Sequence, residues 1–263
     1  MTSQPTPENQ PAVVEIKFPR DKSYDAQFDK IPDIRWYPYV GKSFGENRAR
    51  IMVYAHNIPI DTKRYDNWRD VVCKPKDYWA SRVDEFIYPK RIWPIRYTNT
   101  FRYFIKGAVG LKENYGDDSE PSIIQRIDLF VKRIAYLNFI QDLVKSDQAR
   151  ANADSQQVEL SKKVNSEILK VLGITHCICW GKPTYEYVCS ITGFNKVLPD
   201  KYEGKSGFSS CVIDVGGGKT MQCLKIHHPS MPGFGPFSDT TQSIISRFLE
   251  LETSADGLNH KQL

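Results

Sequence analysis

Long apolar runs, paired cysteines and a strong excess of one charge are all lacking in this sequence of 263 residues. The longest apolar runs, such as Ile174–Trp180, are too short to cross a bilayer. The first residues, 1–12, are polar and proline-bearing, so they are predicted to form a disordered leader and not a secretory signal or transit peptide. These features exclude membrane-spanning, secreted and fibrous proteins and predict a cytoplasmic location.

The six cysteines form neither a disulfide framework nor a recognisable metal motif. Cys177 and Cys179 alternate with Ile178 on an expected strand, and the other four cysteines lie far apart along the chain, with no Cys-x-x-Cys pair. Buried, unreactive thiols are the favoured interpretation. We therefore predict a protein without a metal ion or cofactor.

What the sequence has is an ordinary globular composition with one basic, aromatic segment. Hydrophobic residues make up 40% of the chain and charged residues 25%, which excludes wholesale disorder. The net charge of +5 is concentrated between Lys63 and Lys106, where eleven basic and five acidic residues are mixed with eleven aromatic ones. Such a segment suits a surface that binds phosphates and stacks on bases. The alternative is a set of helices with a solvated basic face and aromatic residues in the core.

Hydrophobic periodicity, interrupted by glycine and proline, predicts an alternation of strands and helices. Strands are expected at residues 50–54, 134–140, 175–180, 209–215 and 221–226. Helices are expected at residues 121–133, 154–173 and 239–251, around Tyr185 and Val188, and two or three times within 64–110. This order predicts an α/β fold, a three-layer α/β/α sandwich with a short, mainly parallel central sheet. We expect one domain at residues 13–252 with a basic helical insertion at 63–110, followed by a flexible tail at 253–263.

The run Gly216-Gly217-Gly218-Lys219-Thr220 has the composition of a phosphate loop but not its pattern. The Walker motif needs a glycine at position 213, which is Ile213, and the following residues read as a strand where the motif requires a helix. A glycine turn between two strands is the better interpretation, and nucleotide triphosphatase activity is excluded.

Three polar segments, Ala55–Asp61, Tyr136–Phe139 and His227–Ser230, lie in or directly after expected strands. In open parallel sheets ligands bind outside the carboxyl ends of the strands, so the first two segments can meet at one pocket. Taken singly, each polar residue also has a structural explanation. Asn57 reads as a turn residue, Asn138 as an amide bonded to backbone and His228 as a loop histidine.

Taken together, these segments resemble the motifs of the uracil-DNA glycosylase superfamily. That family has a first motif after its first strand and closes on His-Pro-Ser, the places held here by Ala55-His56-Asn57 and His228-Pro229-Ser230. Leu137-Asn138-Phe139 is similar to the strand whose asparagine reads the base, and Trp180-Gly181-Lys182 to the segment before the closing motif. The order and spacing agree over about residues 36 to 240.

The first motif departs from the family at three positions. Ala55 replaces a glycine, Asn57 holds the place of an aspartate, and Pro59 stands where many members carry a tyrosine. In the family that tyrosine crowds the carbon-5 edge of the base, so the smaller proline favours a pyrimidine with a 5-substituent. An asparagine positions water but does not take its proton at neutral pH, which indicates a slow enzyme or a good leaving group.

The resemblance implies a monofunctional, metal-free DNA glycosylase that flips out uracil or a 5-modified pyrimidine, for example a modified cytosine of viral DNA. Asn57 would orient water, Asn138 would read the base and His228 would stabilise the departing anion. His56 and Asp61 are nearby groups with base character. Lys63, Arg64 and Ser230 are expected to contact the DNA. Tyr65 or Trp68 would stack on the flipped base, and Phe234 or Phe237 would wedge into the duplex.

DNA is accordingly the expected partner, bound by a monomer. The first alternative is a catalytically inactive DNA-binding module of the same fold, which Ala55 and Asn57 favour because both depart from the family's motif. The second is an interaction protein whose basic segment binds an acidic partner.

Overall fold

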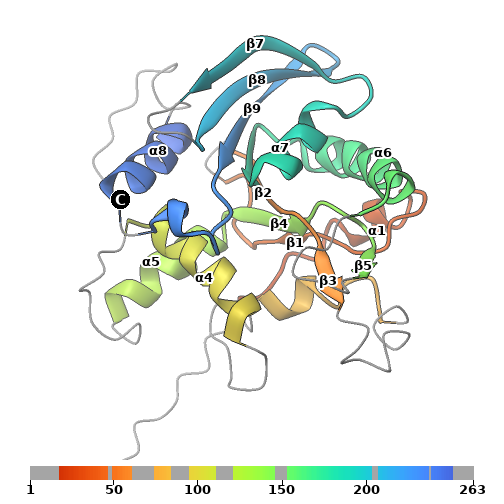
Figure 1. Ribbon diagram of the computed structural model, residues 1–263. Coiled ribbons are helices and arrows are strands. Elements are labelled where there is room, and N and C mark those ends of the chain that lie inside the picture. The colour runs from red at the N-terminus through yellow and green to blue at the C-terminus, as the bar shows by residue number, and fades with distance from the viewer. Residues whose placement is uncertain are drawn as a thin grey trace, which may run out of the picture.

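The computed structural model describes residues 18–46, 49–60, 74–83, 95–110, 121–145, 153–202, 207–236 and 238–250. Its centre is a seven-stranded sheet with the spatial order β1-β4-β2-β6-β9-β8-β7 (Figure 1). In that order the strands are Tyr39–Val40, Ile134–Asn138, Ile51–Ala55, His176–Trp180, Lys219–Ile226, Ser209–Gly216 and Asn195–Tyr202. The predicted α/β class is confirmed.

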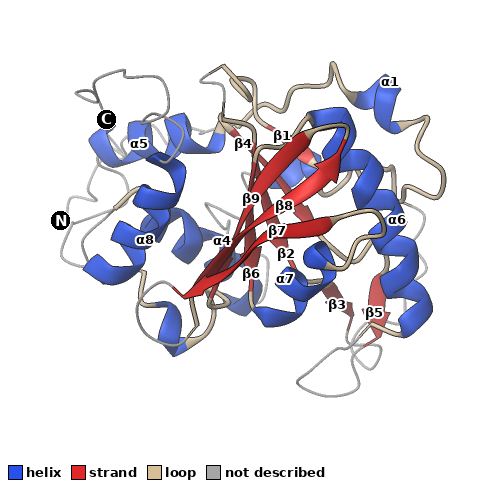
Figure 2. Cartoon of the chain, turned by 90° about the horizontal axis from the view of Figure 1, so that it is seen from above, coloured by secondary structure: helices blue, strands red, loops and turns tan. Residues whose placement is uncertain are grey.

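Helices cover both faces of this sheet, as the view in Figure 2 shows. One face packs against α1 (Asp25–Phe28), α6 (Ser155–Leu172) and α7 (Lys182–Cys189), and the buried residues there form the first core. The other face packs against α4 (Ile95–Ala108), α5 (Pro121–Val131) and α8 (Asp239–Glu250), which enclose the second core. The predicted three-layer α/β/α sandwich is therefore confirmed.

The four neighbouring strands β4, β2, β6 and β9 are parallel, whereas β1, β8 and β7 each join their neighbours antiparallel. Strands β8 and β9 form a hairpin closed by Gly216, Gly217 and Gly218, whose φ angles are 90°, 64° and 71°. Such positive φ angles strain residues that carry a Cβ atom, which explains the three glycines. The glycine turn predicted from the sequence is confirmed.

Several elements were not predicted. A separate pair of parallel strands, β3 (Ile58–Ile60) and β5 (Leu143–Lys145), continues the chain beyond β2 and β4. Strand β7 and the short 3₁₀ helix η2 (Pro232–Phe234) were also missed, whereas the 3₁₀ helix η1 (Ala80–Arg82) lies within the segment predicted to be helical. Of the basic insertion, the structure describes residues 74–83 and 95–110. The expected leader and tail lie outside the described residues.

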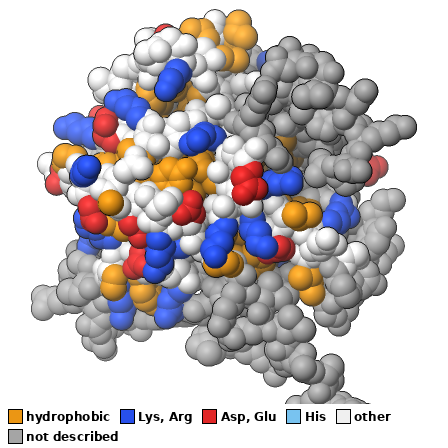
Figure 3. All heavy atoms as spheres, turned by 180° about the vertical axis from the view of Figure 1, so that it is seen from behind, with side chains coloured by type: hydrophobic (Ala, Val, Ile, Leu, Met, Phe, Trp, Pro, Cys, Tyr) orange, Lys and Arg blue, Asp and Glu red, His pale blue; other side chains and the backbone are white. Residues whose placement is uncertain are grey.

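The described surface carries both charges. Figure 3 shows Lys and Arg side chains interspersed with Asp and Glu on the described part of one face. Pairs such as Lys162–Glu159 and Lys170–Glu167 on α6 contribute to this mixture, which is ordinary for a solvated surface. Among the described helices, none combines the length and the apolar character that crossing a membrane requires.

Helix α6 begins and ends where the sequence predicts. Asp154 accepts a hydrogen bond from the Gln157 backbone N–H at 2.8 Å, and the Gln157 side chain accepts one from the Asp154 N–H at 3.1 Å. We expect Asp154→Ala to lower the free energy of unfolding by about 1 kcal/mol, because the Gln157 backbone N–H loses the carboxylate that accepts its hydrogen bond. Urea denaturation measures the loss. Glu159→Ala, an exposed change on the same helix, is the control and should cost less than about 0.5 kcal/mol.

His176 makes the stability of the fold depend on pH. It is 1% exposed on β6, edge-on to the ring of Phe248 in α8, and burial lowers its pKa to about 4. Between the unfolded pKa near 6.5 and the folded value, only the unfolded chain takes up this proton. We therefore expect the contribution of His176 to the free energy of unfolding to have its full value above pH 6.5. As the pH falls to 4, the free energy of unfolding should decrease by about 3 kcal/mol through this residue.

Urea denaturation at pH 7, 5.5 and 4 measures this pH dependence, and His176→Leu is the comparison. The variant lacks the titrating imidazole, so its stability should fall by about 3 kcal/mol less than that of the wild type over this range. An equal fall in both proteins would show that His176 does not account for the effect.

Candidate functional site

Three of the predicted site residues leave the central sheet at the same edge. Ala55 of β2 pairs with Asn138 of β4, and Trp180 of β6 pairs with Ile226 of β9. Asn57 and His228 each follow their strand by two residues, so the three residues lie at the carboxyl ends of three parallel strands, whose ribbons are drawn in Figure 1. This is the end of the strands at which open α/β sheets bind ligands. The structure thus brings the first two segments side by side and the third segment to the same end of the sheet, while the pocket that they are expected to share stays a prediction.

Asn138 and His228 lie on a common face of the sheet. Trp180 and Ile226 belong to the second core, on the side of α4 and α8, and Tyr136 packs against the same core. Side chains two residues apart on a strand point to the same face, which places Asn138 on the side of Tyr136. The ring of His228 lies 6.0 Å, centroid to centroid, from that of Trp180 in an edge-on arrangement. The site therefore faces α4.

His228 is held in one orientation by its own loop. The backbone N–H of Ser230 donates to His228 Nδ1 at 3.3 Å, and the Ser230 hydroxyl lies 2.7 Å from the same nitrogen. Because a backbone N–H only donates, Nδ1 must accept, and the proton of the neutral imidazole is on Nε2. His228 thus presents an N–H donor to whatever binds at this edge.

Both histidines of the site are held neutral. Burial and the neighbouring imidazole of His56 lower the pKa of His228, and burial lowers the pKa of His56. Two imidazoles that are partly removed from water and close to each other resist protonation, because a second positive charge would repel the first. At neutral pH the site consequently offers polar but uncharged groups in Asn57, Asn138 and His228.

His56 lies near enough to His228 to lower its pKa, and its ring also contacts α7. That ring lies 5.8 Å, centroid to centroid, from the ring of Tyr187, which packs against the first core. The Nε2 atom of His56 is buried without a hydrogen-bond partner among the described residues. The sequence analysis grouped His56 with Asn57 as a catalytic residue, and this assignment stays a prediction.

Three aromatic rings form a floor beside the polar residues. Phe101 of α4 lies 4.4 Å from Tyr136, which lies 5.6 Å from Trp180, all between ring centroids. Tyr136 is half-buried, and burial raises the pKa of its hydroxyl, so the phenol keeps its proton. Sequence analysis did not assign these rings to the site. The available signal was the strand periodicity, since Tyr136 precedes Asn138 by two residues and shares its face.

The loop that carries Asn138 is anchored from both sides. Phe139 N–H donates to Ala55 O at 2.8 Å, which ties the loop to β2. Asn165 of α6, a fully buried amide, donates from Nδ2 to Phe139 O and Ser161 O, each at 2.7 Å. Asn165 was missed in the sequence analysis because its position in a helix gave no sign that it bonds a distant strand.

The prediction that Phe234 wedges into DNA is wrong. This ring is fully buried in the second core, where it lies against Gly107 of α4. The reason is the local turn: η2 directs the ring inward, and Thr241 donates a hydrogen bond to the Phe234 carbonyl at 2.5 Å. Ser230, by contrast, is exposed beside His228, as a DNA contact requires.

The remaining predicted site residues lie outside the described residues. They are the residues predicted to act as a base or to contact DNA: Asp61, Lys63, Arg64, Tyr65, Trp68 and Phe237. These assignments stay predictions.

A comparison of the chain with protein-family models, curated proteins and solved structures finds no match. Any assignment of function therefore depends on the motifs and on the geometry at the carboxyl ends of β2, β4 and β9.

Proposed function

We propose that this protein is a monofunctional DNA glycosylase that flips out a pyrimidine and hydrolyses its N-glycosidic bond. The observation that carries the proposal is that Asn57, Asn138 and His228, from three distant segments, lie at the carboxyl ends of three parallel strands, near the aromatic rings of Tyr136 and Trp180. Uracil or a 5-modified pyrimidine is the proposed substrate, and the protein would act on DNA as a cytoplasmic monomer.

His228 would supply the main stabilisation of the transition state. Breaking the glycosidic bond leaves negative charge on the base, and a donor fixed toward that charge lowers the barrier. The bonds from Ser230 leave the Nε2–H of His228 free for this role, and its lowered pKa keeps the ring neutral. A neutral donor can approach the base without the cost of burying an unpaired positive charge.

The other groups would position the reactants. Tyr136, which is half-buried, provides a ring on which an extruded base can stack, a contact worth about 1–3 kcal/mol per base in nucleic-acid complexes, and the buried ring of Trp180 supports Tyr136 from behind. Asn138 offers one donor and one acceptor group to the Watson–Crick edge, and Asn57 can orient water toward the sugar. Base flipping costs a few kcal/mol, which phosphate contacts from the basic segment would offset.

A glycosylase assay tests the proposal. Labelled single- and double-stranded oligonucleotides carrying uracil, mismatched thymine or 5-substituted cytosines are incubated with the full chain, and abasic sites are revealed by alkaline cleavage. We expect an abasic product from at least one modified substrate and none from oligonucleotides with ordinary paired bases. The absence of an abasic product from every substrate would contradict the proposal.

A catalytically inactive DNA-binding module is the second candidate, and one observation favours it. Residue 57 is an amide, which orients water but does not accept its proton at neutral pH. For such a module, DNA affinity should depend steeply on salt, be equal for modified and ordinary bases, and be unchanged in Asn57→Ala and His228→Ala.

A further inference from the structure

Five of the six cysteines converge in the first core, although they are scattered along the sequence. Cys177 of β6 pairs with Cys223 of β9, which in turn pairs with Cys211 of β8, so three thiols stand in a row across adjacent strands. Cys179 lies two residues along β6 on the same face, and the Cys189 sulfur of α7 is 3.9 Å from that of Cys211. The sequence analysis treated these residues as remote from one another, and the sheet register shows that they are neighbours.

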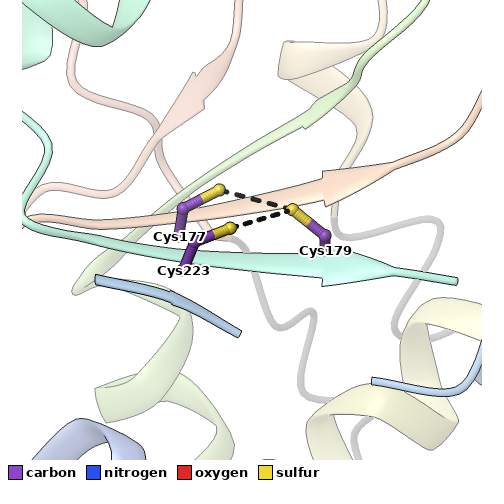
Figure 4. A group of neighbouring side chains, drawn as sticks. All are labelled: Cys177, Cys179 and Cys223. Carbon is purple, nitrogen blue, oxygen red and sulfur yellow. Dashed lines mark hydrogen bonds between the residues drawn. The ribbon is translucent and has the colours of Figure 1, made fainter. Parts of the chain in front are cut away.

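Three of these sulfurs have the spacing of a metal-binding triad (Figure 4). The Sγ atom of Cys179 lies 3.6 Å from that of Cys177 and 3.8 Å from that of Cys223, and all three lie within 4.8 Å of one another. An ion bound by thiolates at about 2.3 Å holds the sulfurs roughly 3.8–4.0 Å apart in tetrahedral or trigonal geometry. The triad therefore needs little movement to accept an ion.

An unpartnered phenol stands next to the triad. Tyr54 of β2 is directly opposite Cys179 on the neighbouring strand and belongs to the same core. Its hydroxyl is fully buried and has no hydrogen-bond partner among the described residues. Burial and the sulfurs of Cys177, Cys179 and Cys223 raise the pKa of this hydroxyl well above its ordinary value. A buried polar group without a partner costs about 1–3 kcal/mol, which an ion or a thiolate beside it would relieve.

We propose that Cys177, Cys179 and Cys223 bind one thiophilic d¹⁰ metal ion, Zn²⁺ or Cu⁺, with the Tyr54 hydroxyl as an additional ligand or hydrogen-bond donor. Soft thiolate ligands select these two ions among those available to proteins. Binding forms three metal–sulfur bonds and releases the protons of the three thiols to solvent, without a change of oxidation state. The ion would tie β6 to β9, the strands that carry Trp180 and His228.

Metal analysis of the full-length protein tests this site. The chain is produced in medium supplemented with Zn²⁺ or with copper, passed through gel filtration with EDTA under reducing conditions, and its metal content is measured by mass spectrometry. We expect about one equivalent of Zn²⁺ or Cu⁺ per chain, since a fully buried thiolate site exchanges slowly with a chelator. Production in Co²⁺ medium should add thiolate-to-cobalt charge-transfer absorption, which reports sulfur ligation directly.

Cys223→Ser and Cys189→Ser form the matched pair of variants. Cys223→Ser removes one ligand and should lose the ion, whereas Cys189→Ser removes a nearby thiol outside the triad and should retain it. Equal metal content in the two folded variants would overturn the assignment. If Cys223→Ser does not fold, the wild type decides alone. Less than about a tenth of an equivalent of either ion, with no cobalt–thiolate absorption, would leave the cluster as packed thiols.

Discussion

Replacement of His228 by alanine is expected to lower the rate of base release by about 100- to 1,000-fold, the usual cost of removing one donor to a developing anion. The Nε2–H of His228 is the donor that the loop geometry leaves free, because Nδ1 accepts from Ser230. The step affected is bond cleavage, so single-turnover kinetics with enzyme in excess measures it. Because His228 is only partly buried at a loop, the fold should persist, which thermal denaturation checks.

Ser230→Ala is the matched control for this loss. It removes the hydroxyl at 2.7 Å from Nδ1 but keeps the backbone N–H of residue 230, which still orients the imidazole. We expect the rate of base release to fall by less than about tenfold. A wild-type rate in His228→Ala would show that the imidazole does not stabilise the leaving base, whatever the identity of that base.

The substitution Asn165→Asp, which replaces one amide nitrogen with oxygen, is expected to lower the free energy of unfolding strongly. Asn165 Nδ2 donates to two carbonyl oxygens, and aspartate would place a carboxylate oxygen against both of them in a fully buried position. We expect the free energy of unfolding at pH 7 to drop by about 4 kcal/mol, through two lost donors and a buried charge. That is a large part of the 5–15 kcal/mol that stabilises a typical domain.

The pH dependence identifies the cause of this loss. Burial would raise the pKa of the new carboxyl in the folded state, so the folded chain binds the extra proton and the deficit should shrink as pH falls from 7 to 5. Gln156→Glu makes the same amide-to-carboxylate change on the exposed first turn of α6 and should be nearly neutral. Urea denaturation of both variants provides the measurement. A pH-independent deficit in Asn165→Asp would indicate a packing defect instead of a buried charge.

Loss of Asn165 should also reach the candidate site. Its amide holds the Phe139 carbonyl, directly after Asn138, while the Phe139 N–H is bonded to Ala55 of β2. Releasing one of the two anchors allows Asn138 to move relative to Asn57. The buried amide thereby acts as a positioning residue for the proposed base-reading side chain.

Strong local signals explain which elements were predictable. For α6, a capping aspartate, apolar residues at helical spacing and a terminal glycine all indicate the same helix, which the structure places at Ser155–Leu172 with Gly173 in a left-handed conformation. The central strands β2, β4, β6 and β9 are short apolar runs bounded by polar or glycine residues, and each was predicted to within about two residues. Alternation with helices was enough to predict a parallel sheet.

Weak local signals explain what was missed. Strand β7 reads as a polar segment interrupted by Pro199, and it is stable only because β8 supplies the partner along an edge with irregular register. Phe234 comes two residues after Pro232 in a loop, where no local pattern predicts a fully buried ring. The direction of its side chain depends on α4, which is distant in sequence.

Sequence alone determined the class of the fold, the ends of its longest helix, the glycine turn and the candidate polar residues, because these depend on spacing and on neighbours a few positions away. Tertiary structure alone decided the strand order, the placement of Asn138 and His228 at the same end of the sheet, the contact of His56 with α7 and the convergence of five thiols. These features are set by strand register and by packing between segments far apart in the chain, and local propensity carries no information about either.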